Sequence, residues 1–141
     1  MPLVEVYIDK AVLSAFKTRA LRSFPIERVE LLWGEIEDST AFVHVMTPVF
    51  VEDASSEGIS FDSDDDYGDQ VGDLTLLGSI HTHPEGVCGP SEDDIEDAKK
   101  EKEIIYGICA IRKGPKRRHV SYCFYDTDSK QLELIVSENE R

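Results

Sequence analysis

The sequence predicts an α+β fold, in which a curved, mostly antiparallel or mixed sheet is flanked by helices. Seven segments have the apolar runs or the apolar and polar alternation of strands. Two further segments instead space their apolar residues as one face of a helix does. Short turns between the last strands favour a largely antiparallel arrangement.

The elements of the first half follow from local signals. Residues 4–8 alternate as an opening strand, and Asp9 can cap the helix that comes next. Pro25 ends that helix, and strands are expected at 29–36 and 41–51. The helix is expected to bury one face, which carries Val12, Leu13, Phe16 and Ala20.

The second half begins with a continuous apolar strand at 74–80. A helix that Ser91 caps is expected to follow and to run to about Glu103. Turn residues then separate the remaining strands. These strands are expected at 104–111, 120–125 and 131–136.

Length and composition are those of a single domain, expected over residues 1–141. No apolar stretch approaches the length of a membrane span, so no membrane partner is expected. The first residues lack the basic and apolar regions of a secretory signal. We therefore expect a soluble, cytoplasmic protein.

The chain is strongly acidic, with 29 Asp and Glu residues against 15 Lys and Arg and a net charge of −14. This charge argues against nucleic acid as a partner, because phosphates would be repelled. Nine of the acids lie in residues 52–73, which contain no Lys or Arg. Such a segment is typical of a solvated insertion loop. The alternative is a flap over a substrate, because the segment directly precedes the strand at 74–80.

Two histidines and an acid follow the strand at 74–80 within a short stretch. Side chains on a strand alternate, so His81 and His83 point to the same side. Pro84 ends the strand and releases the chain into a loop. Ser91 and Asp94 then resemble a capping box, which puts Asp94 in the first turn of the next helix. The loop can return this carboxylate to the two imidazoles.

Two imidazoles and a carboxylate are good zinc ligands, and three protein ligands with one open position are typical of a catalytic site. Taken separately, each part has a plainer interpretation. A histidine pair at this spacing occurs by chance or on a surface, and an acidic segment after a serine is an ordinary capped helix. The combination favours a zinc site at His81, His83 and Asp94.

The segment His81-x-His83-Pro84, six residues, Ser91-x-x-Asp94 resembles the signature of the JAMM (MPN+) metalloprotease family. That family also has an upstream glutamate in a segment similar to P-x-E-x-x-G-x-L-x-G. Glu27 takes this position when Pro25 and Gly34 are in register, and Glu30 then stands where the family usually has glycine. A shifted alignment would make Glu30 or Glu35 the glutamate. The resemblance implies a cytidine-deaminase-like fold.

The resemblance implies a zinc metalloprotease that hydrolyses isopeptide or C-terminal peptide bonds of ubiquitin or ubiquitin-like protein conjugates. In this scheme zinc activates a water molecule, Glu27 is the general base, and Ser91 stabilises the oxyanion. Family members often work in pairs, which implies a homodimer or a partner subunit. Some relatives instead process a sulfur-carrier protein, and inactive relatives serve as scaffolds.

A third class, the zinc deaminases of small molecules, expects a glutamate two residues after its histidine and a Pro-Cys-x-x-Cys motif. This sequence has neither feature.

The three cysteines cannot all pair with one another. Cys109 and Cys123 lie in apolar strand segments, so we expect buried thiols in a reducing compartment. Cys88 lies in the loop between His83 and Asp94. It is either a small residue in a tight loop or a regulatory thiolate that reaches the open zinc position and stops catalysis.

Overall fold

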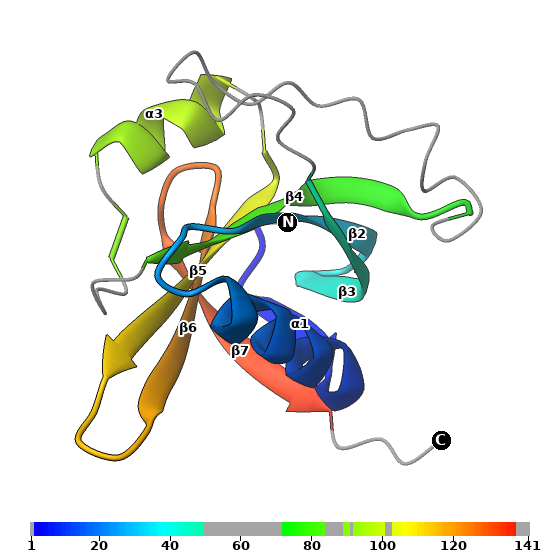
Figure 1. Ribbon diagram of the computed structural model, residues 1–141. Helices are drawn as coiled ribbons and strands as arrows, with labels where there is room; N and C mark the ends of the chain where they lie inside the picture. The colour runs from blue at the N-terminus through cyan, green and yellow to red at the C-terminus, as the bar shows by residue number, and fades with distance from the viewer. Residues whose placement is uncertain (1, 50–71, 84–88, 91, 101–102, 138–141) are drawn as a thin grey trace.

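A computed structural model describes residues 2–49, 72–83, 89–90, 92–100 and 103–137, apart from the side chains of residues 93, 94, 97 and 98. In chain order the elements are β1 (Glu5–Asp9), α1 (Lys10–Ser23), β2 (Val29–Glu37), β3 (Thr40–Pro48), β4 (Thr75–His83), α3 (Glu92–Lys100), β5 (Ile105–Lys113), β6 (Arg118–Asp126) and β7 (Gln131–Ser137). Figure 1 shows α1 and α3 on opposite sides of the molecule.

The strands form one mixed sheet in the order β1-β3-β2-β4-β5-β6-β7, and the pairing of β1 with β7 closes it into a barrel. Strand β1 runs parallel to β3 and β7, and β4 runs parallel to β5, whereas the other pairs are antiparallel. The prediction of an α+β fold with a curved, mixed sheet is confirmed, and the curvature continues to closure. The relation to cytidine deaminases stays a prediction.

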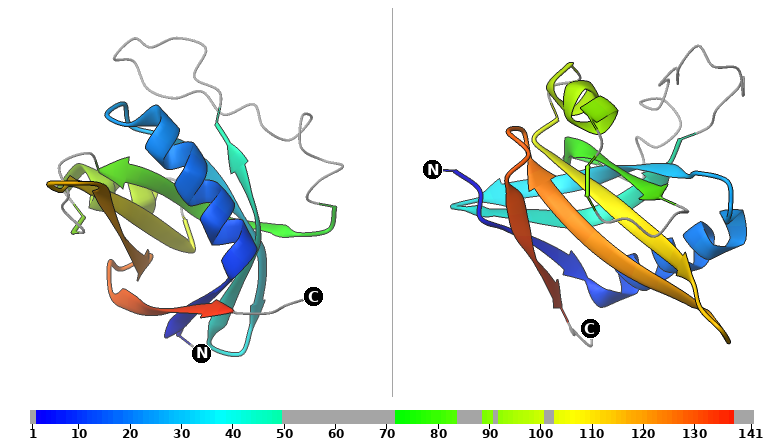
Figure 2. Two further views of the ribbon diagram at one scale, coloured as in Figure 1. Left: turned by 60° about the horizontal axis from the view of Figure 1, so that its bottom comes forward. Right: turned by 90° about the vertical axis from the view of Figure 1, so that its left-hand side faces the viewer.

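Helix α1 lies across the strands and supplies part of the core (Figure 2, left). Its predicted cap is present, because the backbone amide of Ala11 donates a hydrogen bond to Oδ1 of Asp9 at 2.8 Å. Three of its predicted inward residues are buried, namely Leu13, Phe16 and Ala20. They pack with inward residues from all seven strands. The amphipathic pattern therefore correctly predicted the buried face of α1.

Strand β5 is buried on both faces, which explains its continuous apolar sequence. Ile105, Cys109 and Ile111 belong to the core on the α1 side. Tyr106 and Ile108 belong to a separate outer apolar cluster, which also contains Tyr125. Strand β4 lies between β2 and β5, so its own outward side chains lie beside this cluster.

Two boundaries differ from the predictions. Strand β3 ends at Pro48, and residues 50 and 51 of the predicted strand lie outside the described residues. Helix α3 is described from Glu92 to Lys100, residues 101 and 102 lie outside the described residues, and Glu103 is no longer helical. The backbone amide of Ile104 donates to the carbonyl of Leu77, which joins the chain to β4.

The described part of α3 adds no side chain to the apolar core, so the prediction of flanking helices is not confirmed there. Most of the acidic segment at 52–73 also lies outside the described residues. Neither of the two described helices is long and apolar enough to cross a membrane.

Candidate metal centre

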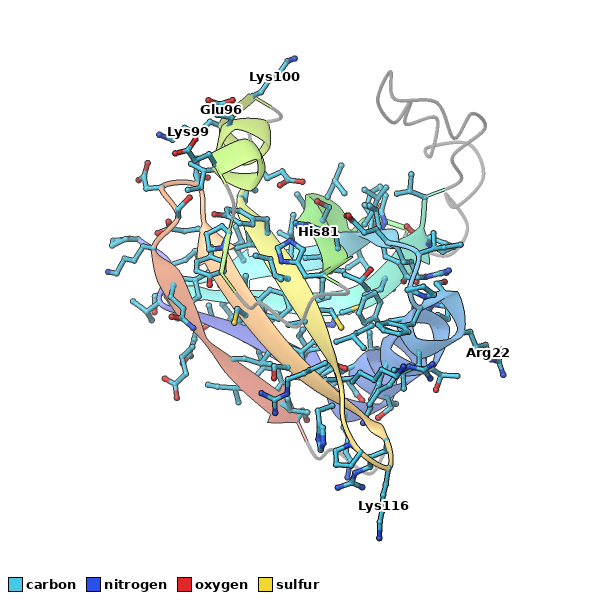
Figure 3. All side chains as sticks on the ribbon, turned by 60° about the vertical axis from the view of Figure 1, so that its left-hand side comes forward. Arg22, His81, Glu96, Lys99, Lys100 and Lys116 are labelled. Carbon is cyan, nitrogen blue, oxygen red and sulfur yellow. The ribbon has the colours of Figure 1, made fainter. Side chains whose placement is uncertain are left out.

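The two histidines of β4 lie together on the outer face of the barrel, near the end of the strand. Their neighbours Ile80 and Thr82 are buried on the opposite face, whereas His81 and His83 are partly buried. The Nε2 atoms of the two imidazoles are 2.9 Å apart, and the ring centroids are 4.7 Å apart. Figure 3 shows His81 on the end of β4 near the middle of the molecule. Both rings therefore point to the same side, as strand alternation predicts.

The convergence of the two Nε2 atoms fits a pair of metal ligands. Two imidazole nitrogens that share a tetrahedral zinc ion, each about 2.0 Å from it, lie roughly 3.3 Å apart. A small movement of the rings from their 2.9 Å separation is enough to reach this geometry. Nitrogen ligands and a partly buried position suit Zn²⁺ better than Mg²⁺ or Ca²⁺, which prefer oxygen.

Backbone pairing on both sides of β4 fixes the orientation of the histidines. His81 lies opposite Ile108 of β5, and His83 lies opposite Ala110. On the other side, the amide of Thr82 donates to the carbonyl of Arg28 at 3.0 Å. The amide of Arg28 in turn donates to Oγ1 of Thr82 at 2.8 Å. The histidines thus belong to a central strand rather than to a loop, and the strand pairing on both sides limits their movement.

Glu27 lies two residues before β2, whose first residue pairs with His81 of β4. The register pairs Val29 with His81, and the bonds between Arg28 and Thr82 continue that pairing by one residue. A further step places Glu27 opposite His83. Opposing residues of an antiparallel pair project to the same face, so this position favours a Glu27 side chain on the face of the histidines. Glu27 is also exposed to solvent, as a residue that meets a substrate must be.

The two rival glutamates are placed elsewhere. Glu30 lies opposite Ile80, and its side chain is fully buried among arginines. Glu35 is exposed and lies 2.9 Å from the imidazole of His44 on β3. It is six residues beyond Val29 on β2, which corresponds to about 20 Å along a strand. The geometry therefore favours Glu27 over both alternatives.

Comparison with known proteins identifies the family. A sequence profile described as prokaryotic homologues of the JAB domain, Prok-JAB, matches residues 9–122. The chain belongs to the Prok-JAB family. The match includes Glu27, both histidines and Asp94, and the resemblance to the JAMM (MPN+) family is confirmed.

Solved structures show the same fold for this Prok-JAB chain. The protein DSY2949 of Desulfitobacterium hafniense is 21% identical, with a TM-score of 0.66 and coverage of 95% of this chain and 94% of that one. AF2198, a JAB1/MPN domain protein of Archaeoglobus fulgidus, is 19% identical, with a TM-score of 0.62 and coverage of 96% and 100%.

A third structure, described as a JAMM metalloprotease-like zinc site in the proteasome and signalosome, is 18% identical to the Prok-JAB chain. Its TM-score is 0.56, and the match covers 96% of this chain and 99% of that one. No curated protein matches the sequence significantly.

The other predicted site residues of the Prok-JAB chain are only partly placed. Asp94 is the third residue of α3, but its side chain lies outside the described part. Ser91 and Cys88 are outside the described residues altogether. Among the side chains that are described, no group of three His, Cys, Asp or Glu residues could hold a metal ion. The structure therefore brings together the histidine pair and the Glu27 segment, and the third ligand stays a prediction.

Sequence reasoning missed a polar network behind the histidines. Glu30 accepts hydrogen bonds from Arg19 and Arg28, and Arg28 is also joined through its backbone to Thr82. One signal could have indicated it, because a glutamate inside an otherwise apolar strand needs a charged partner when it is buried. Which arginines would meet it depends on the packing of α1, which the sequence does not show.

The cysteine predictions of the Prok-JAB chain have different outcomes. Cys109 is a free, buried cysteine, as expected. Cys123 is disulfide-bonded, so the prediction of a free thiol is wrong at that position. Burial raises the pKa of the Cys109 thiol to about 12, and the charge of Lys17 opposes this to a smaller extent.

Cys109 is therefore expected to resist alkylation in the folded protein. With a pKa of about 12, only about one molecule in ten thousand carries the reactive thiolate at pH 8. Mass spectrometry after iodoacetamide treatment should show Cys109 unmodified in native protein and modified in urea. Equal labelling rates in the two states would contradict its burial.

Proposed function

We propose that this Prok-JAB chain is a JAMM-type zinc metalloprotease. Its substrates are isopeptide or C-terminal peptide bonds of ubiquitin or ubiquitin-like protein conjugates. The observation that carries the proposal is the convergence of the His81 and His83 nitrogens beside Val29 of β2, which Glu27 precedes by two residues. A surface histidine pair of no function would not need to stand at the end of a central strand beside an exposed glutamate.

The residues fall into three roles. His81 and His83, together with Asp94 from the first turn of α3, would hold the metal. When bound, zinc supplies a Lewis acid that polarises the scissile carbonyl and lowers the pKa of water. Glu27 is the general base, and Ser91 is the hydrogen-bond donor to the developing oxyanion.

Hydrolysis then follows from these roles. As the water oxygen bonds to the carbonyl carbon, the Glu27 carboxylate takes its proton. Ser91 donates a hydrogen bond to the oxygen that becomes negative. Glu27 then passes the proton to the amine nitrogen as the carbon–nitrogen bond breaks, which leaves a carboxylic acid and a free amine, and the acid's proton moves to the more basic amine. The same steps apply to a lysine isopeptide bond and to a peptide bond.

The relationship to the JAMM family is the main support for ubiquitin or ubiquitin-like conjugates as the substrate class. One structural neighbour is described by a metalloprotease-like zinc site in the proteasome and signalosome. The proposal includes a homodimer or a partner subunit as the working form, since the family often acts in pairs.

Removal of zinc should abolish cleavage. The zinc-loaded chain is expected to hydrolyse a ubiquitin-like protein joined through its C-terminus to a lysine amine or fused to a short peptide. Dialysis against a chelator should remove this activity, and added zinc should restore it. His83→Ala should weaken zinc binding by more than the roughly 100-fold that changes around a metal site cause. Zinc affinity and product formation are measured on the same samples by chelator competition and mass spectrometry.

His44→Ala is the matched control, because His44 is also a strand histidine but lies on β3 and contacts Glu35. It should leave zinc affinity and cleavage unchanged. A wild-type chain that binds zinc and cleaves none of the conjugates or fusions would favour the scaffold alternative. Cleavage that persists without metal would overturn the proposal.

A further inference from the structure

Behind the histidine pair, on the opposite face of the sheet, lies a buried ion cluster made of Glu30, Arg19 and Arg28. The Glu30 side chain is 0% exposed. One carboxylate oxygen accepts from Nη2 of Arg19 at 2.7 Å. The other accepts from Nε of Arg19 at 2.8 Å and from Nε of Arg28 at 2.6 Å. Each arginine is less than one-third exposed, so the charges are largely shielded from water.

The two arginines attach Glu30 to different parts of the fold. Arg19 comes from α1, so its contact joins that helix to β2. Arg28 directly follows Glu27 and precedes β2. Its guanidinium also donates to Oγ of Ser23 at 3.3 Å, and its backbone bonds with Thr82 at two points. Arg28 is therefore held at its side chain and at its backbone.

The alternating directions of successive side chains relate the anchored Arg28 to the face that carries the histidines. Neighbouring residues of an extended segment project to opposite faces. With the Arg28 side chain fixed against Glu30 on the α1 side, continued alternation by one residue would turn Glu27 to the outer face. Thr82, the partner of Arg28, stands between His81 and His83. One set of contacts thus fixes both the glutamate and the histidine strand.

We propose that the ion pair of Glu30 with Arg28 is a positioning device that holds Glu27 against the histidine pair, and that the Arg19 contact serves mainly to hold α1. The inference depends on the proposed role of Glu27 as general base. In the family motif a glycine usually stands where this chain has Glu30, so the device is a feature of this chain. Arg28 and Glu30 are positioning residues that act through Glu27.

The two arginines allow a matched test. Glu30→Ala would leave two cations facing each other and is expected to disturb folding, so the cations are changed instead. Arg28→Gln and Arg19→Gln each remove one positive charge from the same carboxylate. Arg19 makes two of the three bonds to Glu30. A merely structural cluster therefore predicts that Arg19→Gln is at least as damaging as Arg28→Gln, both to the urea midpoint and to activity.

The positioning role predicts the opposite order for catalysis. Arg28→Gln should lower kcat by about 100-fold, the effect of misplacing a reacting group by about 1 Å, with KM and zinc affinity little changed. Arg19→Gln should stay within about threefold of wild type in kcat, although its urea midpoint falls as far or further. Arg28→Lys, which keeps a cation beside Glu30, should recover part of the loss. Equal losses of kcat in the two glutamine variants would overturn the inference while leaving the proposed function intact.

A spectroscopic measurement tests the same point without cleavage. The visible absorption of the cobalt-loaded protein is titrated with pH, and Glu27→Gln defines how the curve changes when the general base is lost. Arg28→Gln should shift the midpoint towards that of Glu27→Gln, and Arg19→Gln should keep the wild-type midpoint. If neither arginine variant shifts the midpoint while Glu27→Gln does, Arg28 does not position Glu27. If the wild type cleaves no substrate, this titration still decides the positioning question.

Discussion

Glu27→Gln is expected to lower the rate of conjugate cleavage by about 1,000-fold, within the range that general bases contribute. Glutamine keeps the size and polarity of the side chain but cannot accept the proton of the attacking water. Because Glu27 adjoins the histidines without being counted among the ligands, the variant should still bind about one zinc per chain. Initial cleavage rates and metal content by elemental analysis are measured on the same preparation.

Glu35→Gln provides the control for Glu27→Gln. Glu35 is an exposed glutamate of β2, paired with His44 and displaced from the histidines along that strand. Its replacement should change neither rate nor metal content. Retention of full activity by Glu27→Gln would remove Glu27 from the mechanism. Loss of zinc in that variant would instead make Glu27 a ligand, which contradicts the roles proposed for His81, His83 and Asp94.

Gly34→Ala is expected to destabilise the fold by at least about 3 kcal/mol. A Cβ atom at Gly34 would lie 1.7 Å from the carbonyl oxygen of Phe42 and 3.1 Å from Cα of Val43. These are backbone atoms of β3, which cannot move aside as a flexible side chain can. The register between β2 and β3 shifts between Trp33 and Gly34, so the glycine lies at an irregularity where the two strands approach closely. Urea unfolding, followed by the fluorescence of the single tryptophan, measures the loss.

Gly89→Ala is the control for Gly34→Ala, because a Cβ at Gly89 would meet no atom of the described residues within 4 Å. Its free energy of unfolding should change by less than about 0.5 kcal/mol. A Gly34→Ala protein as stable as wild type would show that β2 and β3 are farther apart than described. The close approach also gives a physical reason for a glycine at this position of the family motif.

Features that depend on neighbouring residues were predictable from the sequence. The shared orientation of His81 and His83 follows from strand alternation alone, and the structure has both rings on one face. The cap at Asp9 and the inward face of α1 follow from local spacing in the same way. These features can be predicted correctly without knowing how the rest of the chain folds.

Features that depend on distant pairing were not predictable. Closure of the barrel joins β1 to β7, which lie at opposite ends of the sequence. The expected position of Glu27 beside His83 depends on the register of β2 against β4, and only the family motif pointed to it. Glu30 was a rival base because a shifted alignment of the family motif would use it, and the sequence does not show that Arg19 of α1 packs against it.

Cys123 illustrates the same limit. Its apolar segment correctly predicts a strand, but a disulfide depends on which residue lies across from it in space. Glu103 lies outside α3 for a similar reason, because the next amide, that of Ile104, bonds to the carbonyl of Leu77 on β4, far away in sequence.

The most direct test of the account is an anomalous X-ray diffraction experiment at the zinc absorption edge, on crystals of the zinc-loaded protein. We predict one strong peak per chain, about 2.0–2.1 Å from Nε2 of His81 and of His83, with a carboxylate oxygen of Asp94 as third protein ligand. The Glu27 carboxylate should lie near the peak without bonding to it. A peak away from the two histidines, or none in protein that cleaves its substrate, would contradict the zinc centre on which the proposed function depends.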